Sequence, residues 1–87
     1  MFYPEIINRY LLVLKFKYPF QTPAQNCDMP FSGQHLMWML ETVRDSETMP
    51  DTKKHRWLGF VQGVLSYQGL INVDEERDIT RPIFNGE

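Results

Sequence analysis

Residues 51–69 carry the clearest pattern of apolar and polar positions in the chain. Asp51 suits the capping position at the start of a helix, and Gly69 suits the left-handed residue that ends one. Between them, apolar residues recur every three or four positions, which is the spacing of one helical face. We therefore predict a helix over residues 52–68. Its buried stripe is expected to consist of Trp57, Val61, Val64 and Leu65, with Leu58 and Phe60 at the margins.

A second helical pattern precedes this one at residues 34–45. Ser32 is placed to cap that helix, and an apolar stripe follows at helical spacing. A short turn joins the two segments, so we predict an antiparallel helical hairpin in which the two stripes cover each other. A short third helix is expected at about residues 74–81, before Pro82 ends it. The stripe of the 34–45 helix consists of Leu36, Met39, Leu40 and Val43.

The N-terminal segment has two competing interpretations. Between Arg9 and Tyr18, apolar residues alternate with other residues in a period of two, which favours an extended strand or arm. A helix over residues 6–14 is the alternative, because the first half of the segment is apolar on both faces. A lone strand would need a partner for its backbone groups, either the apolar residues 70–73 or another chain.

These elements predict one small, mainly α domain over residues 1–87. Residues 1–31 form its strand or arm and a Pro-rich loop, and residues 32–82 form its helical core. The loop over residues 19–30 holds three prolines, and we expect Phe20, Met29 and Phe31 to anchor it. Because 43% of the residues are hydrophobic and so short a chain has little interior, we expect apolar surface to meet a partner, including another copy.

Charge and cysteine content narrow the function classes. The net charge of −2 disfavours a general nucleic-acid binder without excluding one. The single cysteine, Cys27, cannot form an internal disulfide, which favours a reducing compartment. The first ten residues lack the pattern of a signal peptide, and no apolar run is long enough to span a membrane. We therefore expect a small soluble protein of the cytoplasm that does not enter a membrane.

Residues suited to catalysis or metal binding are scattered. His35, His55 and Cys27 lack the close spacing of zinc ligands, so no metal site is predicted. No nucleophile lies near a base with an orienting acid, and no glycine-rich phosphate loop is present. We therefore predict no catalytic residue, no cofactor and no enzymatic activity.

Three surface features are not explained by folding alone. Cations occupy the first turn of the 52–68 helix, where the helix dipole disfavours them, so they either pair with nearby acids or bind an anion. Gly59 and Gly63 each cost about 1 kcal/mol relative to alanine within a helix. We expect them to admit a close neighbour, either from this chain or from a partner. Met37 and Trp38 lie off the apolar stripe, either beneath the Pro-rich segment or as an interface hot spot.

Two sets of candidate site residues follow from these features. The acidic run near the C-terminus is included in the first set as a possible contact surface, although such a run is more often a solvated face. The candidate partner-binding residues are Met37, Trp38, His55, Gly59, Gly63, Ser66, Asp74, Glu75, Glu76 and Asp78. The alternative anion-binding residues are Arg9, Lys15, Lys17, Lys53, Lys54 and Arg56.

The segments HLMWMLETV, HRWLGFVQGVL and GLINVDEERDITR resemble a type of small protein encoded by tailed phages and prophages. The resemblance spans roughly residues 34–82 and is most specific where HRWLGFVQGVL precedes DEERD. It assigns no activity, so it transfers no functional residue. It implies a gene context in which proteins of this size commonly bind host proteins, including defence-system components, and inhibit or redirect them. We therefore expect a non-enzymatic binder of a host protein, with a small nucleic-acid-associated regulator using a basic patch as the alternative.

Overall fold

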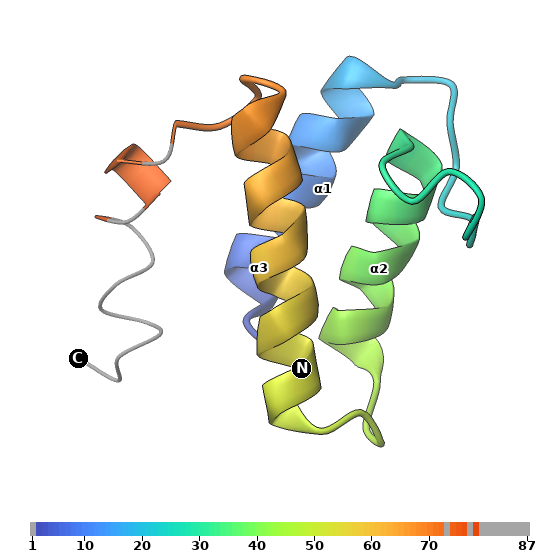
Figure 1. Ribbon diagram of the computed structural model, residues 1–87, viewed down its shortest axis with the longest axis vertical. Coiled ribbons are helices and arrows are strands. Elements are labelled where there is room, and N and C mark those ends of the chain that lie inside the picture. Colours follow the sequence, from blue (N-terminus) through green and yellow to red (C-terminus); the bar gives the residue numbers. More distant parts are fainter. Residues whose placement is uncertain (1, 73, 77, 79–87) are drawn as a thin grey trace.

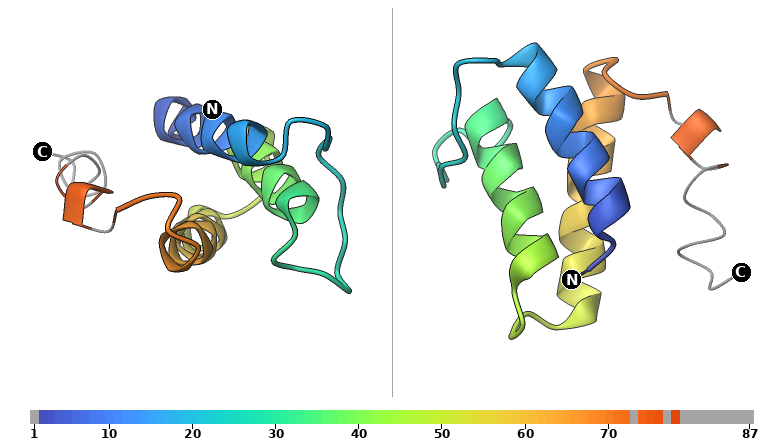
Figure 2. Two further views of the ribbon diagram at one scale, coloured as in Figure 1. Left: turned by 90° about the horizontal axis from the view of Figure 1, so that it is seen from above. Right: turned by 180° about the vertical axis from the view of Figure 1, so that it is seen from behind.

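Three helices form the body of the protein in a computed structural model that describes residues 2–72, 74–76 and 78. They are α1 (Pro4–Lys17), α2 (Gly33–Asp45) and α3 (Asp51–Tyr67). The helices run up, down and up, and α2 packs against both of the others (Figure 1). Seen from above, they surround a common interior (Figure 2). The mainly α architecture and the helical hairpin are therefore confirmed, and the core consists of Ile6, Ile7, Tyr10, Leu14, Leu36, Met37, Met39, Leu40, Val43, Leu58, Val61 and Leu65.

The N-terminal segment is a helix, so the predicted strand or arm is wrong. Pro4 stands in the first turn of α1, where a missing N–H costs nothing, and the buried residues follow at helical spacing. Leu12 and Phe16, two members of the alternating pattern, are 68% and 93% exposed. The alternation therefore marks no buried strand face. A helix satisfies its own backbone hydrogen bonds, whereas a lone strand here would have left them unpaired.

The start of α2 agrees with the prediction. The Ser32 hydroxyl accepts a hydrogen bond from the backbone N–H of His35 at 3.2 Å, and the predicted stripe of α2 is buried. Residues 19–30 form the predicted loop, which is fastened to α2 where the N–H of Asn26 donates to Nδ1 of His35 at 2.9 Å. Of the three side chains expected to anchor it, Phe20 and Met29 do not, since they are 98% and 61% exposed, whereas Phe31 stacks on Phe60 of α3.

The buried side of α3 is rotated relative to the prediction. Trp57 and Val64 are only half-buried, and the residues that face the core are Lys54, Leu58, Val61 and Leu65. The helix also begins one residue earlier than predicted, with Pro50 in the cap position and Asp51 inside the first turn. The predicted stripe mixed two adjacent apolar rows of the same helix.

The C-terminal end of α3 is formed as predicted. Gly69 has a φ of 74°, in the left-handed region, and the N–H of Leu70 donates to the carbonyl of Leu65 at 2.9 Å. Beyond it, residues 74–76 and 78 are helical, while the rest of the predicted 74–81 helix lies outside the described residues. In the ranges that the structure describes, no helix combines the length and the apolar character that crossing a membrane requires.

Candidate protein-binding face of α3

A second row of residues lies on α3, on the side opposite the core. Arg56, Phe60, Gly63 and Tyr67 follow each other at intervals of four, three and four residues, and we call them the outer row. At about 100° per residue, their mean direction is roughly 160° away from that of the buried residues. All four are exposed, and Tyr67 is 93% accessible to solvent. Helix α3 therefore presents two aromatic side chains, Phe60 and Tyr67, to solvent on the side away from the core.

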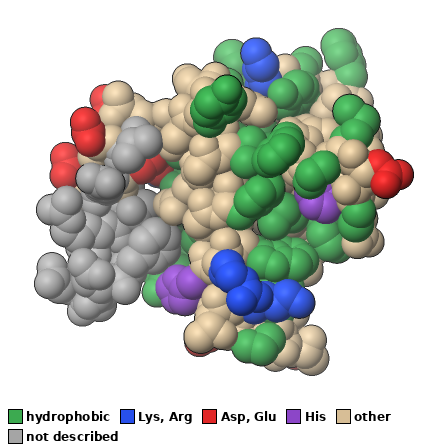
Figure 3. Space-filling view, viewed as in Figure 1, with side chains coloured by type: hydrophobic (Ala, Val, Ile, Leu, Met, Phe, Trp, Pro, Cys, Tyr) green, Lys and Arg blue, Asp and Glu red, His purple; other side chains and the backbone are tan. Residues whose placement is uncertain are grey.

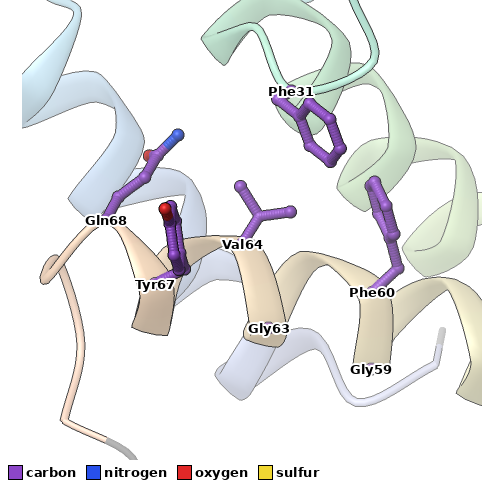
Figure 4. Close-up of a pocket in the computed structure, with 7 residues that line it drawn as sticks. All are labelled: Phe31, Gly59, Phe60, Gly63, Val64, Tyr67 and Gln68. Carbon is purple, nitrogen blue, oxygen red and sulfur yellow. The ribbon is translucent and has the colours of Figure 1, made fainter.

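The outer row borders an open groove of about 560 Å³. Figure 4 shows Phe31 reaching it from the loop before α2, while the remaining lining residues come from α3 and its C-terminal cap. The rings of Phe31 and Phe60 stack with their centroids 5.8 Å apart and their planes 21° from parallel. Nearly every group in this groove is apolar. It is lined by Phe31, Gly59, Phe60, Gly63, Val64, Tyr67 and Gln68.

Gly59 and Gly63 leave open space on this face. A Cβ built on either residue would meet no atom within 4 Å in the described part of the chain. The close neighbour that the sequence predicts at these glycines is therefore not supplied by the described residues. What they provide instead is a smooth strip of backbone between the aromatic side chains.

The candidate residues of α2 separate into core and surface. Met37 is 1% exposed and belongs to the core, so its predicted role as an interface residue is wrong. Trp38 is half-buried and lies 5.7 Å from Trp57, centroid to centroid, and 5.3 Å from His35. Lys53 places its ammonium 5.4 Å from the centre of the Trp57 ring. Figure 3 shows the resulting gathering of hydrophobic side chains over α3 and α2, with basic side chains at its lower end.

The six predicted anion-binding residues do not form one basic patch, so that prediction is wrong. Lys15 and Lys17 lie in the last turn of α1, where the helix dipole favours cations. That turn is at the opposite end of the bundle from the first turn of α3 (Figure 1). Arg9 forms an ion pair with Glu76, and Lys54 is only 8% exposed. Lys53 and Arg56 remain as exposed cations beside the groove.

Lys54 has a structural role at the hairpin turn. Its Nζ donates to the carbonyl of Ser46 at 2.6 Å, and it lies 5.3 Å from the centre of the Phe2 ring. Ser46 is the residue that ends α2. The ammonium therefore ties the start of α3 to the end of α2, which explains a cation in a turn where the helix dipole disfavours one.

The acidic run also separates into buried and exposed members. Glu76 is 7% exposed, and its Oε1 accepts hydrogen bonds from Arg9 and from the Tyr10 hydroxyl. Burial alone would raise the pKa of Glu76, but the hydrogen bonds and the charge of Arg9 outweigh it and lower that pKa. Asp74, Glu75 and Asp78 are exposed. Glu76 is thus a structural residue, and the other three acids remain candidates for a contact surface.

The remaining candidates, His55 and Ser66, do not line the groove. His55 is exposed and contacts the rings of Phe2 and Tyr3 at 5.0 and 5.8 Å between centroids. Ser66 is half-buried. Only Gly59 and Gly63 of the groove were among the predicted site residues, so five groove residues were missed: Phe31, Phe60, Val64, Tyr67 and Gln68. The spacing of Arg56, Phe60 and Tyr67 could have revealed Tyr67, whereas Phe31 has no local signal.

Among the described residues, no group of three His, Cys, Asp or Glu side chains is placed to hold a metal ion. The face of α3 is instead an aromatic groove with a glycine floor and a basic end, an arrangement suited to contact with another macromolecule. Comparison with known proteins found no family model, no curated protein and no solved structure that matches this chain.

Proposed function

We propose that this chain is a non-enzymatic phage accessory protein that binds a host protein and modulates or inhibits it, using the groove on the outer face of α3. The observation that carries the proposal is the exposure of Phe31, Phe60 and Tyr67 around this groove. Large aromatic side chains stabilise a fold by burial, but Phe60, Phe31 and Tyr67 leave 38%, 58% and 93% of their surface exposed in the free chain. Burial of these side chains against a partner stabilises a complex, which accounts for their position on the surface.

The chemistry of the groove favours a protein over other ligands. Aromatic side chains and arginine are enriched at the centres of protein interfaces, and Arg56 stands at the end of the aromatic row. The glycine floor lets a partner's side chains or backbone approach α3 closely. The resemblance to phage accessory proteins supplies the host protein as the partner class, with defence-system components among the candidates.

Site-specific crosslinking tests this proposal. A photoreactive phenylalanine analogue in place of Tyr67 should capture a defined host protein in cells, and the purified pair should then form a complex. Phe60→Ala and Tyr67→Ser should each abolish or strongly weaken that complex. Phe16→Ala is the matched control, because Phe16 is as exposed as Tyr67 but lies on α1. It should leave binding unchanged.

Two results would contradict the proposal. One is a complex that depends on Phe16 and not on Phe60 or Tyr67, which would move the binding face to α1. The other is tight binding of nucleic acid with an affinity that falls steeply as salt rises, which is the signature of phosphate contacts. In that case the exposed cations, and not the aromatic groove, would be the working residues.

A further inference from the structure

The outer row of α3 is self-complementary under twofold symmetry. Its intervals of four, three and four residues read the same in both directions. If a second α3 packs antiparallel, with the twofold axis between Phe60 and Gly63, each residue of the row meets a residue of a different kind. Phe60 then lies opposite Gly63 of the second copy, and Arg56 lies opposite Tyr67 of the second copy. A twofold axis requires this kind of matching, since one patch must fit itself.

Both contacts of this arrangement are chemically favourable. Gly63 has open space where a side chain would stand, so a phenylalanine ring can enter it. Phe60 is 38% exposed and available to do so. Arg56 and Tyr67 are a guanidinium and an aromatic ring, which attract each other when the cation lies over the ring face. Arg56 and Phe60, in the N-terminal half of the row, thus contact Gly63 and Tyr67, in the C-terminal half of the row of the second copy.

The charges along α3 favour the antiparallel direction. The exposed cations Lys53 and Arg56 stand near its N-terminal end, and its last turn contains no basic residue. Antiparallel pairing brings the basic end of one copy to the C-terminal end of the other, where the helix dipole attracts cations. Parallel pairing would place the two basic ends together.

We propose that two copies of this chain pair through the outer rows of antiparallel α3 helices. The dimer covers the groove with the aromatic and glycine residues of the second copy. The consequence for regulation rests on the function proposed above: a host protein that binds the same face competes with self-association. Dilution of the protein then exposes the binding face, and accumulation of free protein covers it.

Sedimentation velocity of the purified full chain over a range of concentrations tests this inference. The natural chain should show a reversible monomer–dimer equilibrium. Phe60→Ala and Gly63→Phe should each raise the dimer dissociation constant by about tenfold or more. Phe60→Ala removes the ring from the contact, and Gly63→Phe fills the space that receives the ring. The double variant Phe60→Ala/Gly63→Phe restores a ring opposite a small residue. It should recover most of the lost affinity.

Charge variants test the direction of pairing. Arg56→Glu should weaken the dimer by a similar factor, because a carboxylate replaces the cation opposite the Tyr67 ring and the C-terminal end of the second helix. Lys17→Glu is the matched control, because it makes the same charge change on an exposed residue of α1. It should leave the equilibrium unchanged. Circular dichroism confirms that each variant is folded, and Gly63→Phe is expected to fold because its position is open.

A chain that stays monomeric at every concentration overturns the inference. So does a dimer that tolerates Gly63→Phe and Arg56→Glu, which would have its interface elsewhere. The two proposals fail separately. A monomeric chain that still crosslinks a host protein at Tyr67 leaves the proposed function intact, and a dimer with the expected variant pattern but no host partner leaves only the dimer.

Discussion

The hydroxyl of Tyr10 donates a hydrogen bond to Oε1 of Glu76 at 2.6 Å, across 66 residues of sequence. Tyr10 is fully buried, and the same hydroxyl accepts a hydrogen bond from Nε2 of Gln62 at 2.9 Å. One phenol oxygen therefore links α1, α3 and the helical residues that follow them. Burial, and after it the hydrogen bond to Glu76, raises the pKa of Tyr10, so the hydroxyl stays protonated and able to donate.

Tyr10→Phe should destabilise the protein by about 1–3 kcal/mol, because it leaves a buried carboxylate oxygen and a glutamine amide each without one hydrogen bond. Urea unfolding followed by circular dichroism measures the change. Tyr67→Phe is the matched control, since Tyr67 is 93% exposed. Its effect on the free energy of unfolding should be close to zero. Equal effects for the two variants would contradict a structural role for the Tyr10 hydroxyl.

The ionised carboxyl of Glu76 should make stability depend on pH. Its pKa in the folded chain is below the ordinary value of 4.5, so the unfolded chain binds the proton more readily. Stability from this group is therefore complete above that ordinary value and is lost as the pH falls through the lower, folded pKa. The side chain of Glu76 is 9% exposed and that of Arg9 is 37% exposed, so solvent screens the ion pair in part.

Glu76→Gln separates this contribution from that of other carboxyl groups. At neutral pH the variant should be less stable by about 1–2 kcal/mol, because a charge-assisted hydrogen bond becomes a neutral one. The difference from the natural chain should shrink as the pH falls below 4.5 and through the lower, folded pKa of Glu76, since the natural chain then also carries a neutral group. Unfolding midpoints in urea at each pH measure it. A difference that stays constant with pH would mean that the charge of Glu76 contributes nothing.

Local sequence patterns predicted the structure correctly where a capping residue or a helix-ending glycine marks the end of a helix. Ser32 caps α2, and Gly69 ends α3 in the left-handed conformation, as the sequence indicates. Each of these signals depends on residues within one or two turns. Hence α2 and the C-terminal end of α3 could be derived without knowledge of tertiary contacts.

The errors occurred where distant contacts decide the outcome. Helix α1 is apolar around much of its surface, so its alternating residues imitate a strand, and only the packing of Tyr10 and Leu14 against the other helices identifies the buried face. For the same reason, two apolar rows on α3 could not be separated, and Val64 was assigned to the wrong one. The groove depends on Phe31, which is close to Phe60 only in the folded chain.

Lys54→Met should destabilise the hairpin by about 1–2 kcal/mol, although it makes the position more apolar. It removes the hydrogen bond from Nζ to the carbonyl of Ser46 and the contact of the ammonium with the Phe2 ring. Thermal unfolding measures the effect. Lys17→Met is the matched control, because Lys17 is exposed at the end of α1, and it should change stability by less than about 0.5 kcal/mol. If both variants are neutral, Lys54 does not hold the turn.

Gly33→Ala and Gly63→Ala should change stability in opposite directions. At Gly63 the added methyl meets open space, so the helix gains about 0.5–1 kcal/mol. At Gly33 it would lie 2.4 Å from Cδ2 of Tyr18 and 2.7 Å from Oε1 of Gln21, which forces the Tyr18 ring to move. We expect a net loss of about 1–3 kcal/mol there, despite the better helix propensity of alanine.

Thermal unfolding of both glycine variants at low protein concentration provides the measurement, since dilution keeps self-association from contributing. The Tyr18→Ala background supplies the control for the clash. Removing the ring should eliminate most of the penalty of Gly33→Ala, because the two residues are then no longer in contact. If Gly33→Ala stabilises the natural chain as much as Gly63→Ala does, the packing of Tyr18 over the start of α2 is looser than these contacts indicate.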